Sequence, residues 1–130
     1  MDARSVAAPA ATTRETGVRW EDAALGYLQR QGLKLVARNF SCRLGEIDLI
    51  MRDRDHLVFV EVRFRVADAH GDGTFSVGPA KRVKITRTAS VYLQRHPALS
   101  ALPCRFDVIG CSGTFAAPVF DWTRAAFDAF

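Results

Sequence analysis

Residues 45–65 read GEIDLIMRDRDHLVFVEVRFR, and this stretch decides the fold. Apolar residues, many of them β-branched, alternate along both halves, which is typical of β-strands. The polar segment DRDH at 53–56 predicts the tip of a hairpin between the two strands. A hairpin symmetric about that tip has one entirely apolar face, which favours this register because a slip of one residue would turn the face over. Its facing pairs are Ile47 with Val62, Leu49 with Val60, and Met51 with Val58.

The other face of the predicted hairpin carries charged residues in two adjacent cross-strand pairs. Glu46 faces Arg63, and opposite charges across strands stabilise a sheet by roughly 0.2–1 kcal/mol. Asp48 faces Glu61, and two like charges in that position are destabilising, more so where neighbours such as Phe59 exclude water. Either one carboxyl holds a proton or a cation lies between them, and oxygen ligands favour a hard cation such as Mg²⁺ or Mn²⁺.

A helix is predicted over residues 18–32, and it places a carboxylate on its apolar face. Glu21 lies on the same stripe as Ala24, Leu25 and Leu28, where a charge needs a partner. Glu21 either pairs with an arginine such as Arg38 or points toward Asp48 and Glu61.

The remaining segments predict an α/β domain. Strands are expected at 33–40 and 104–111, a Gly-rich loop at 66–79, and a second helix at 80–96 that Pro97 ends. Residues 117–130 are expected to form a short strand and then a short terminal helix. The order α-β-β-β-α-β-(β)-α indicates a mixed sheet flanked by helices. Residues 1–16 read as a flexible tail and residues 17–130 as one domain.

Composition narrows the class of protein. The chain has 130 residues, a net charge of +4 and a pI of about 9.3, a mild basic excess that permits a polyanionic partner without requiring one. No apolar run reaches the roughly 18 residues of a membrane helix, and the N-terminal residues lack the apolar core of a secretory signal. The odd number of cysteines predicts free thiols and no disulfide, and hence a cytoplasmic protein.

The helix glutamate followed by D…E-x-R across a hairpin resembles the restriction-endonuclease-like, or PD-(D/E)xK, nuclease fold. More closely, the chain resembles the YraN family of small bacterial proteins with that fold. The stretches that match are EDAALGYLQRQG, RNFSCRLGEIDLIMRD, LVFVEVRFR, AKRVKITRTASVYL and CRFDVIG, within about residues 18–112.

The resemblance implies a nucleic-acid ligand and a set of site residues. Asp48 and Glu61 match the metal ligands, the Val62 main-chain carbonyl would be the third, and Glu21 would support the metal or a water. The implied cofactor is Mg²⁺ or Mn²⁺, and the implied activity is endonucleolytic, on DNA rather than RNA. A homodimer is left open.

Arg63 departs from the PD-(D/E)xK pattern, which usually has lysine in this place, although some YraN-like sequences also have arginine there. A guanidinium stays protonated near neutral pH and cannot act as a general base, although it can orient a water or neutralise a phosphate. Lys81 or Lys84 could substitute if the start of the second helix faces the site. The alternative is a non-catalytic nucleic-acid-binding or adaptor module that keeps the nuclease fold. The residues expected to contact phosphate are Lys81, Arg82, Lys84 and Arg87.

Overall fold

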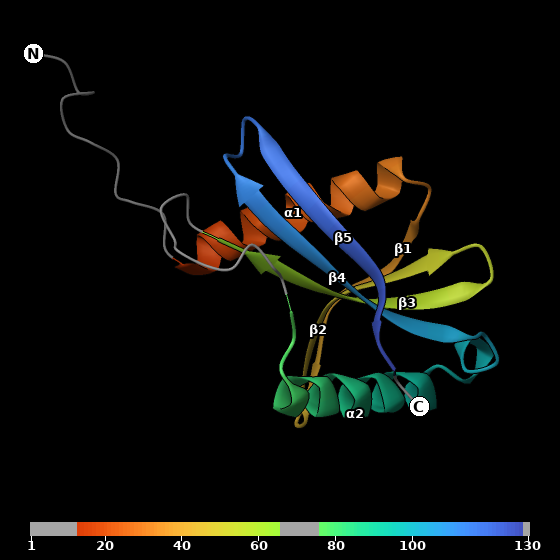
Figure 1. Ribbon diagram of the computed structural model, residues 1–130. Helices are drawn as coiled ribbons and strands as arrows, with labels where there is room; N and C mark the ends of the chain where they lie inside the picture. Colours follow the sequence, from red (N-terminus) through yellow and green to blue (C-terminus); the bar gives the residue numbers. More distant parts are fainter. Residues whose placement is uncertain (1–12, 66–75, 129–130) are drawn as a thin grey trace, which may run out of the picture.

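The computed structural model describes residues 13–65 and 76–128, which form a five-stranded sheet with a helix on each face (Figure 1). The long helices are α1 and α2, and a short 3₁₀ helix, η2, follows the second. The elements in chain order are α1 (Thr13–Arg30), β1 (Lys34–Cys42), β2 (Gly45–Asp53), β3 (His56–Phe64), α2 (Pro79–Arg95), η2 (Pro97–Leu99), β4 (Cys104–Gly113) and β5 (Pro118–Phe127).

The strands lie in the order β1-β2-β3-β4-β5, and only β3 and β4 run parallel. A parallel pair needs a long crossover connection, and α2 provides it. The predicted hairpin register is confirmed next to the turn, where β2 and β3 are paired from the tip as far as Leu49 with Val60. The mixed α/β class predicted from the sequence is therefore confirmed.

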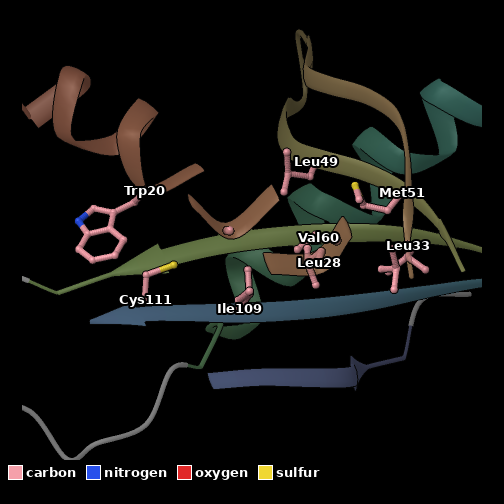
Figure 2. Packing of buried hydrophobic residues seen from close by; sticks show 10 residues of the cluster. Trp20, Leu28, Leu33, Leu49, Met51, Val60, Ile109 and Cys111 are labelled. Atoms are coloured by element: carbon pink, nitrogen blue, oxygen red, sulfur yellow. The ribbon is translucent and has the colours of Figure 1, made fainter. Parts of the chain in front are cut away.

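Each face of the sheet is buried under its own helix, so the molecule has two apolar layers. On one face, Trp20 and Leu28 of α1 pack on side chains of β2, β3 and β4 such as Leu49 and Val60, as Figure 2 shows, and Ala24 belongs to the same cluster. On the other face, α2 packs on Phe59 and its neighbours. Fully burying a large apolar side chain stabilises a protein by roughly 1.5–3 kcal/mol, so both layers contribute substantially. The α2 residues buried in the second layer are Ile85, Thr88, Ala89 and Tyr92.

The regular alternation of side chains between the two faces of the sheet is interrupted near Asn39 in β1 and Asp48 in β2. Phe40 is opposite Ile47 in the ladder, and both pack on the α2 side. Ile50 packs on that side too, although strict alternation would place Ile47 with Leu49 on the α1 side. The expectation that Ile47 shares the face of Leu49 is therefore wrong. Asn39 in β1, at the level of Asp48, has a left-handed φ of 52°, and β1 shows the same reversal, because Ala37 and Phe40 both pack on the α2 side.

The predicted terminal helix is wrong, because β5 continues to Phe127. Phe120 and Trp122 point alternately inward onto α1, with ring centroids 4.6 and 6.4 Å from that of Tyr27, and this two-residue period specifies a strand. The last part of β5 is held by Asp107 of β4, which accepts hydrogen bonds from Trp122 Nε1 and from Ala125 N, both at 3.0 Å.

At the other end, α1 begins at Thr13, so residues 13–16 of the predicted tail are helical. Residues 1–12 of that tail, and residues 66–75 of the predicted Gly-rich loop, lie outside the described residues. Neither long helix within the described ranges is sufficiently long and apolar to cross a membrane. All three cysteines are free, as predicted.

Candidate active site

Asp48 lies where the β2–β3 ladder ends. Beyond the pair of Leu49 and Val60, the amide of Val62 donates a 2.8 Å hydrogen bond to Asp48 Oδ2. The carboxylate thus takes the place of a main-chain acceptor. The Asp48 side chain therefore points toward the main chain of β3, part-way along β2 and just beyond the last pair of the ladder.

Glu61 of β3 is only 5% exposed and shares a hydrogen bond with the Asp48 carboxyl. Burial, together with the negative charge of Glu61, raises the pKa of Asp48 to about 8, although the hydrogen bond from the Val62 amide opposes the shift. The pair therefore retains a proton near neutral pH, and the Lys81 ammonium beside Glu61 favours Asp48 as the carboxyl that holds it. The opposed carboxylates deduced from the hairpin register are brought together in the structure.

Lys81, in the first turns of α2, lies directly over this pair. Its Nζ is 2.5 Å from Glu61 Oε2, and Arg63 Nη1 is 3.7 Å from the same oxygen. Arg63 also donates to the Ser76 carbonyl at 3.0 Å. Two cations therefore compensate one buried carboxylate, and the end of the chain segment that leads into α2 is tied to β3.

The predicted pair of Glu46 and Arg63 is wrong. Within the described part of the chain, Arg63 binds Glu61 and Ser76 and forms no ion pair with Glu46. The reversal of alternation at Asp48 explains this, because it moves Glu46 to the α1 side, where its charge acts on Glu21.

Glu21 of α1 meets the site only at longer range. Arg38 Nη2 is 3.7 Å from Glu21 Oε1 but 2.8 Å from Asp22 Oδ1, so the arginine binds Asp22 more closely. Burial, more than any other effect, raises the pKa of Glu21, with Arg38 opposing it. The charge of Glu21 also contributes to the raised pKa of Asp48. Glu21 therefore forms a loose ion pair with Arg38, and its negative charge also acts on Asp48, so both alternatives considered for Glu21 are present in part.

Asn39 is the site residue that sequence reasoning missed. The register of β1 on β2 puts Asn39 opposite Asp48, and its side-chain amide acts to lower the pKa of Glu21. Asparagine adopts the left-handed region more readily than other non-glycine residues. An Asn inside a β-prone run was therefore the available signal. Asn39 and Glu21 border a cavity of about 500 Å³ that Ser41 and Glu46 also line.

The four basic residues predicted to contact phosphate divide between two flanks of α2. Lys81 and Lys84 project from the flank next to β1 and β2, and Arg87 lies farther round on the exposed side. Arg82 occupies the opposite flank, where its Nε donates to the Val77 carbonyl at 2.6 Å and its guanidinium lies 5.5 Å from the Phe127 ring centroid. Arg82 therefore has structural partners.

The donors at the carboxylate pair fit a hard divalent cation. Two carboxylates forced together, with the pKa of one strongly raised, are the arrangement that a bound cation would relieve. In residues 13–65 and 76–128 no three His, Cys, Asp or Glu side chains gather closely enough to hold a metal. The third donor would be main chain: the N–H and C=O of a strand residue point to the same neighbour, so the Val62 carbonyl faces Asp48 as its amide does.

Comparison with known proteins identifies similar sequences in bacteria. Residues 20–111 match the model of a family described as "Uncharacterised protein family UPF0102". A UPF0102 protein of Nitrosococcus oceani is 48% identical over 117 residues, which cover 90% of this chain and 94% of that protein. One from Xanthomonas oryzae pv. oryzae is 49% identical, covering 92% and 96% of the two chains. One from Alkalilimnicola ehrlichii is 46% identical, covering 99% and 98%.

Proposed function

The chain belongs to the uncharacterised protein family UPF0102, and we propose that it is a metal-dependent nuclease of the PD-(D/E)xK type, acting on DNA rather than RNA. The observation that carries the proposal is the buried pair of Asp48 and Glu61 with Lys81 and Arg63 beside it. Functional sites are where such perturbed carboxylates concentrate. The helix, hairpin and crossover helix leading to a parallel strand support a restriction-endonuclease-like fold.

Asp48, Glu61 and the Val62 carbonyl would hold Mg²⁺ or Mn²⁺. The metal, when bound, would lower the pKa of a coordinated water and act as a Lewis acid toward a phosphate oxygen. Glu61 is held in place by Lys81, and Asp48 by the Val62 amide, so the two carboxylates are oriented before any ligand arrives. Glu21, which reaches Asp48 through its charge, would help to keep a water in the adjoining cavity.

Lys81 would take the role of the lysine that usually follows the glutamate in PD-(D/E)xK nucleases. Arg63 occupies that lysine's place in sequence, but its guanidinium cannot accept a proton near neutral pH. The Lys81 ammonium reaches the same carboxylate from α2 instead. There it can neutralise charge that develops on a phosphate or orient the attacking water, while Arg63 contacts a second phosphate oxygen.

We further propose a nucleic-acid-binding surface on α2, a cytoplasmic location and a possible homodimer. Lys84 and Arg87 continue the positive charge of Lys81 along α2, whose residues 79–95 include no Asp or Glu. Such a surface attracts a phosphate backbone. Free thiols and the lack of a spanning helix among the described residues agree with the cytoplasm. A homodimer is consistent with the resemblance to PD-(D/E)xK nucleases, and light scattering would measure the oligomeric state.

The test is cleavage of labelled linear, flapped and branched DNA, and of RNA, with Mg²⁺ or Mn²⁺. We expect cleavage of DNA that EDTA abolishes and that Asp48→Asn and Glu61→Gln each remove. Asp55→Asn, an exposed carboxylate at the far tip of the same hairpin, is the matched control and should leave the rate unchanged. Absence of cleavage on every substrate, or cleavage that survives both site variants, would disprove the proposal.

A second candidate is a non-catalytic nucleic-acid-binding module. It is favoured by one specific observation: Lys81 and Arg63 already compensate Glu61, and Asp48 is neutral when protonated, so the site is balanced without a metal. This candidate predicts salt-sensitive binding of nucleic acid that EDTA does not change, with no cleavage. The same substrates, measured for binding and for cleavage, separate the two candidates.

A further inference from the structure

A second recess lies on the same flank of α2, away from the carboxylates. It is formed between the turn that joins β1 to β2 and the last turns of α2, and its volume is about 440 Å³. That volume is within the range of roughly 300–1,000 Å³ typical of small-ligand sites. Its lining residues are Cys42, Arg43, Leu44, Val91 and Arg95.

The recess combines an apolar lining with a cationic rim. Leu44 is 45% exposed at the tip of the turn, a position that polar residues usually occupy, and Cys42 and Val91 are half-buried beneath it. Arg43 and Arg95 are exposed at the rim, and the Arg95 guanidinium lies 5.7 Å from the Phe40 ring centroid. A flat, weakly polar group attached to a negative charge is the ligand that such a site would suit.

The recess is continuous with the basic flank that leads from the carboxylate pair. Gly45, next to the turn, packs against Lys84, whose Cβ would lie 3.8 Å from a Cβ placed on this glycine. At 3.6 residues per turn, Lys81, Lys84 and Arg95 project from one flank of α2, and its rise puts the two ends of this row about 20 Å apart. A nucleic-acid strand following the row would pass from the recess to Glu61.

We propose that this recess receives an unpaired nucleobase from a single-stranded segment whose phosphates follow Lys84 and Lys81 toward the carboxylate pair. A stacked and paired base keeps its faces covered, so only an unpaired or extruded base can enter between the turn and α2. Apolar contacts with a base do not depend on which base it is, while the phosphates supply salt-dependent affinity. The inference rests on the proposed function and specifies its substrate class as single-stranded or locally unpaired nucleic acid.

The test measures binding in EDTA, so that it does not depend on cleavage. Fluorescence anisotropy would compare a labelled single-stranded DNA, an abasic strand of the same length, and a blunt duplex. We expect the wild type to bind the single strand about five-fold more tightly than the abasic strand, since burial of the base against Leu44 and Val91 removes apolar surface from water. Leu44→Ser should remove this preference, and Arg95→Gln should weaken it.

Val119→Ser is the matched control, because Val119 is a 60% exposed aliphatic residue on β5, outside the recess, and it should behave as wild type. Thermal melts of each variant verify folding. Equal affinity for the normal and abasic strands, tighter binding of the duplex, or identical behaviour of Leu44→Ser and Val119→Ser would overturn the inference. Loss of cleavage in Mg²⁺ with the base preference intact would instead count against the proposed function alone.

Discussion

Lys81 reaches Glu61 from a different element of the fold: its Nζ lies 2.5 Å from Oε2 of a carboxylate that is 6% exposed on its side chain. The two residues are brought together because α2, the crossover between β3 and β4, starts beside the end of β3. This contact gives the site a lysine despite the arginine at position 63. It also leaves Asp48 as the carboxyl that must lose a proton before a cation can be held.

Replacing Lys81 by Met should reduce DNA cleavage by about 100-fold or more, the typical contribution of a positioned proton-transfer or charge-stabilising group. Lys84→Met, three residues along the same flank, should reduce only substrate binding and its salt dependence. Steady-state kinetics at two salt concentrations would distinguish the two effects. A Lys81→Met enzyme with an unchanged kcat would rule out the role given to this lysine.

The stability of the protein should fall as the pH rises through the neutral range. The pKa of Asp48 is raised from 3.8 to about 8 on folding, so the stabilisation is complete below about pH 4 and is lost toward pH 8, where the folded carboxyl must ionise. Asp48→Asn cannot ionise and preserves the shape of the neutral acid. In urea titrations, the unfolding free energy of Asp48→Asn should rise relative to that of wild type between pH 4 and pH 8. The unfolding free energy of Asp55→Asn should match that of wild type at every pH.

Asn39 is expected to be sensitive to backbone conformation as well as to side-chain chemistry. At φ 52°, Asn39→Ala should be less stable than Asn39→Gly by about 1 kcal/mol, because glycine alone adopts this region freely. Both variants lose the Asn39 amide, which lies opposite Asp48 and acts on Glu21. Both should therefore lose activity to a similar extent. Equal stability of the two variants in urea titrations would show that the left-handed conformation is not maintained in solution.

Asp107 should be a determinant of stability and not of activity. It is 1% exposed and accepts hydrogen bonds from Arg105 Nε, Trp122 Nε1 and Ala125 N, each at 3.0 Å. Asp107→Ala leaves the Trp122 and Ala125 donors without a partner and leaves Arg105 with Asp53 alone, which should destabilise the fold by about 2–4 kcal/mol. Asp121→Ala on exposed β5 should change the unfolding free energy by less than about 0.5 kcal/mol. Thermal and urea unfolding would measure the difference.

The central hairpin could be predicted because its apolar residues allow only one register. That register correctly placed Asp48 against Glu61. The prediction then failed one step further along, at Glu46, because alternation was assumed to continue past Asn39. Both strands reverse their faces at this level, beside a left-handed residue in β1, and hydrophobic periodicity contains no information about such an irregularity.

The contacts that complete the site depend on tertiary structure. Lys81 was predicted to replace the usual lysine only if the start of α2 faces the site. The sequence between β3 and α2 does not indicate where α2 starts relative to β3. The terminal helix was predicted within the segment APVFDWTRAAFDAF at 117–130, whereas the observed strand is held by Asp107, which is distant in sequence. Tertiary hydrogen bonds of this kind override weak local propensity.

Isothermal titration calorimetry with Mn²⁺ at pH 7 tests the central claim most directly. The account predicts one saturable binding event in the wild type, with proton release that is visible as a dependence on the ionisation enthalpy of the buffer, since Asp48 must lose its proton to bind a cation. Asp48→Asn and Glu61→Gln should abolish the event, and Asp55→Asn should retain it. No saturable binding to wild type, or binding unchanged in Asp48→Asn, would contradict the assignment of a metal to this carboxylate pair.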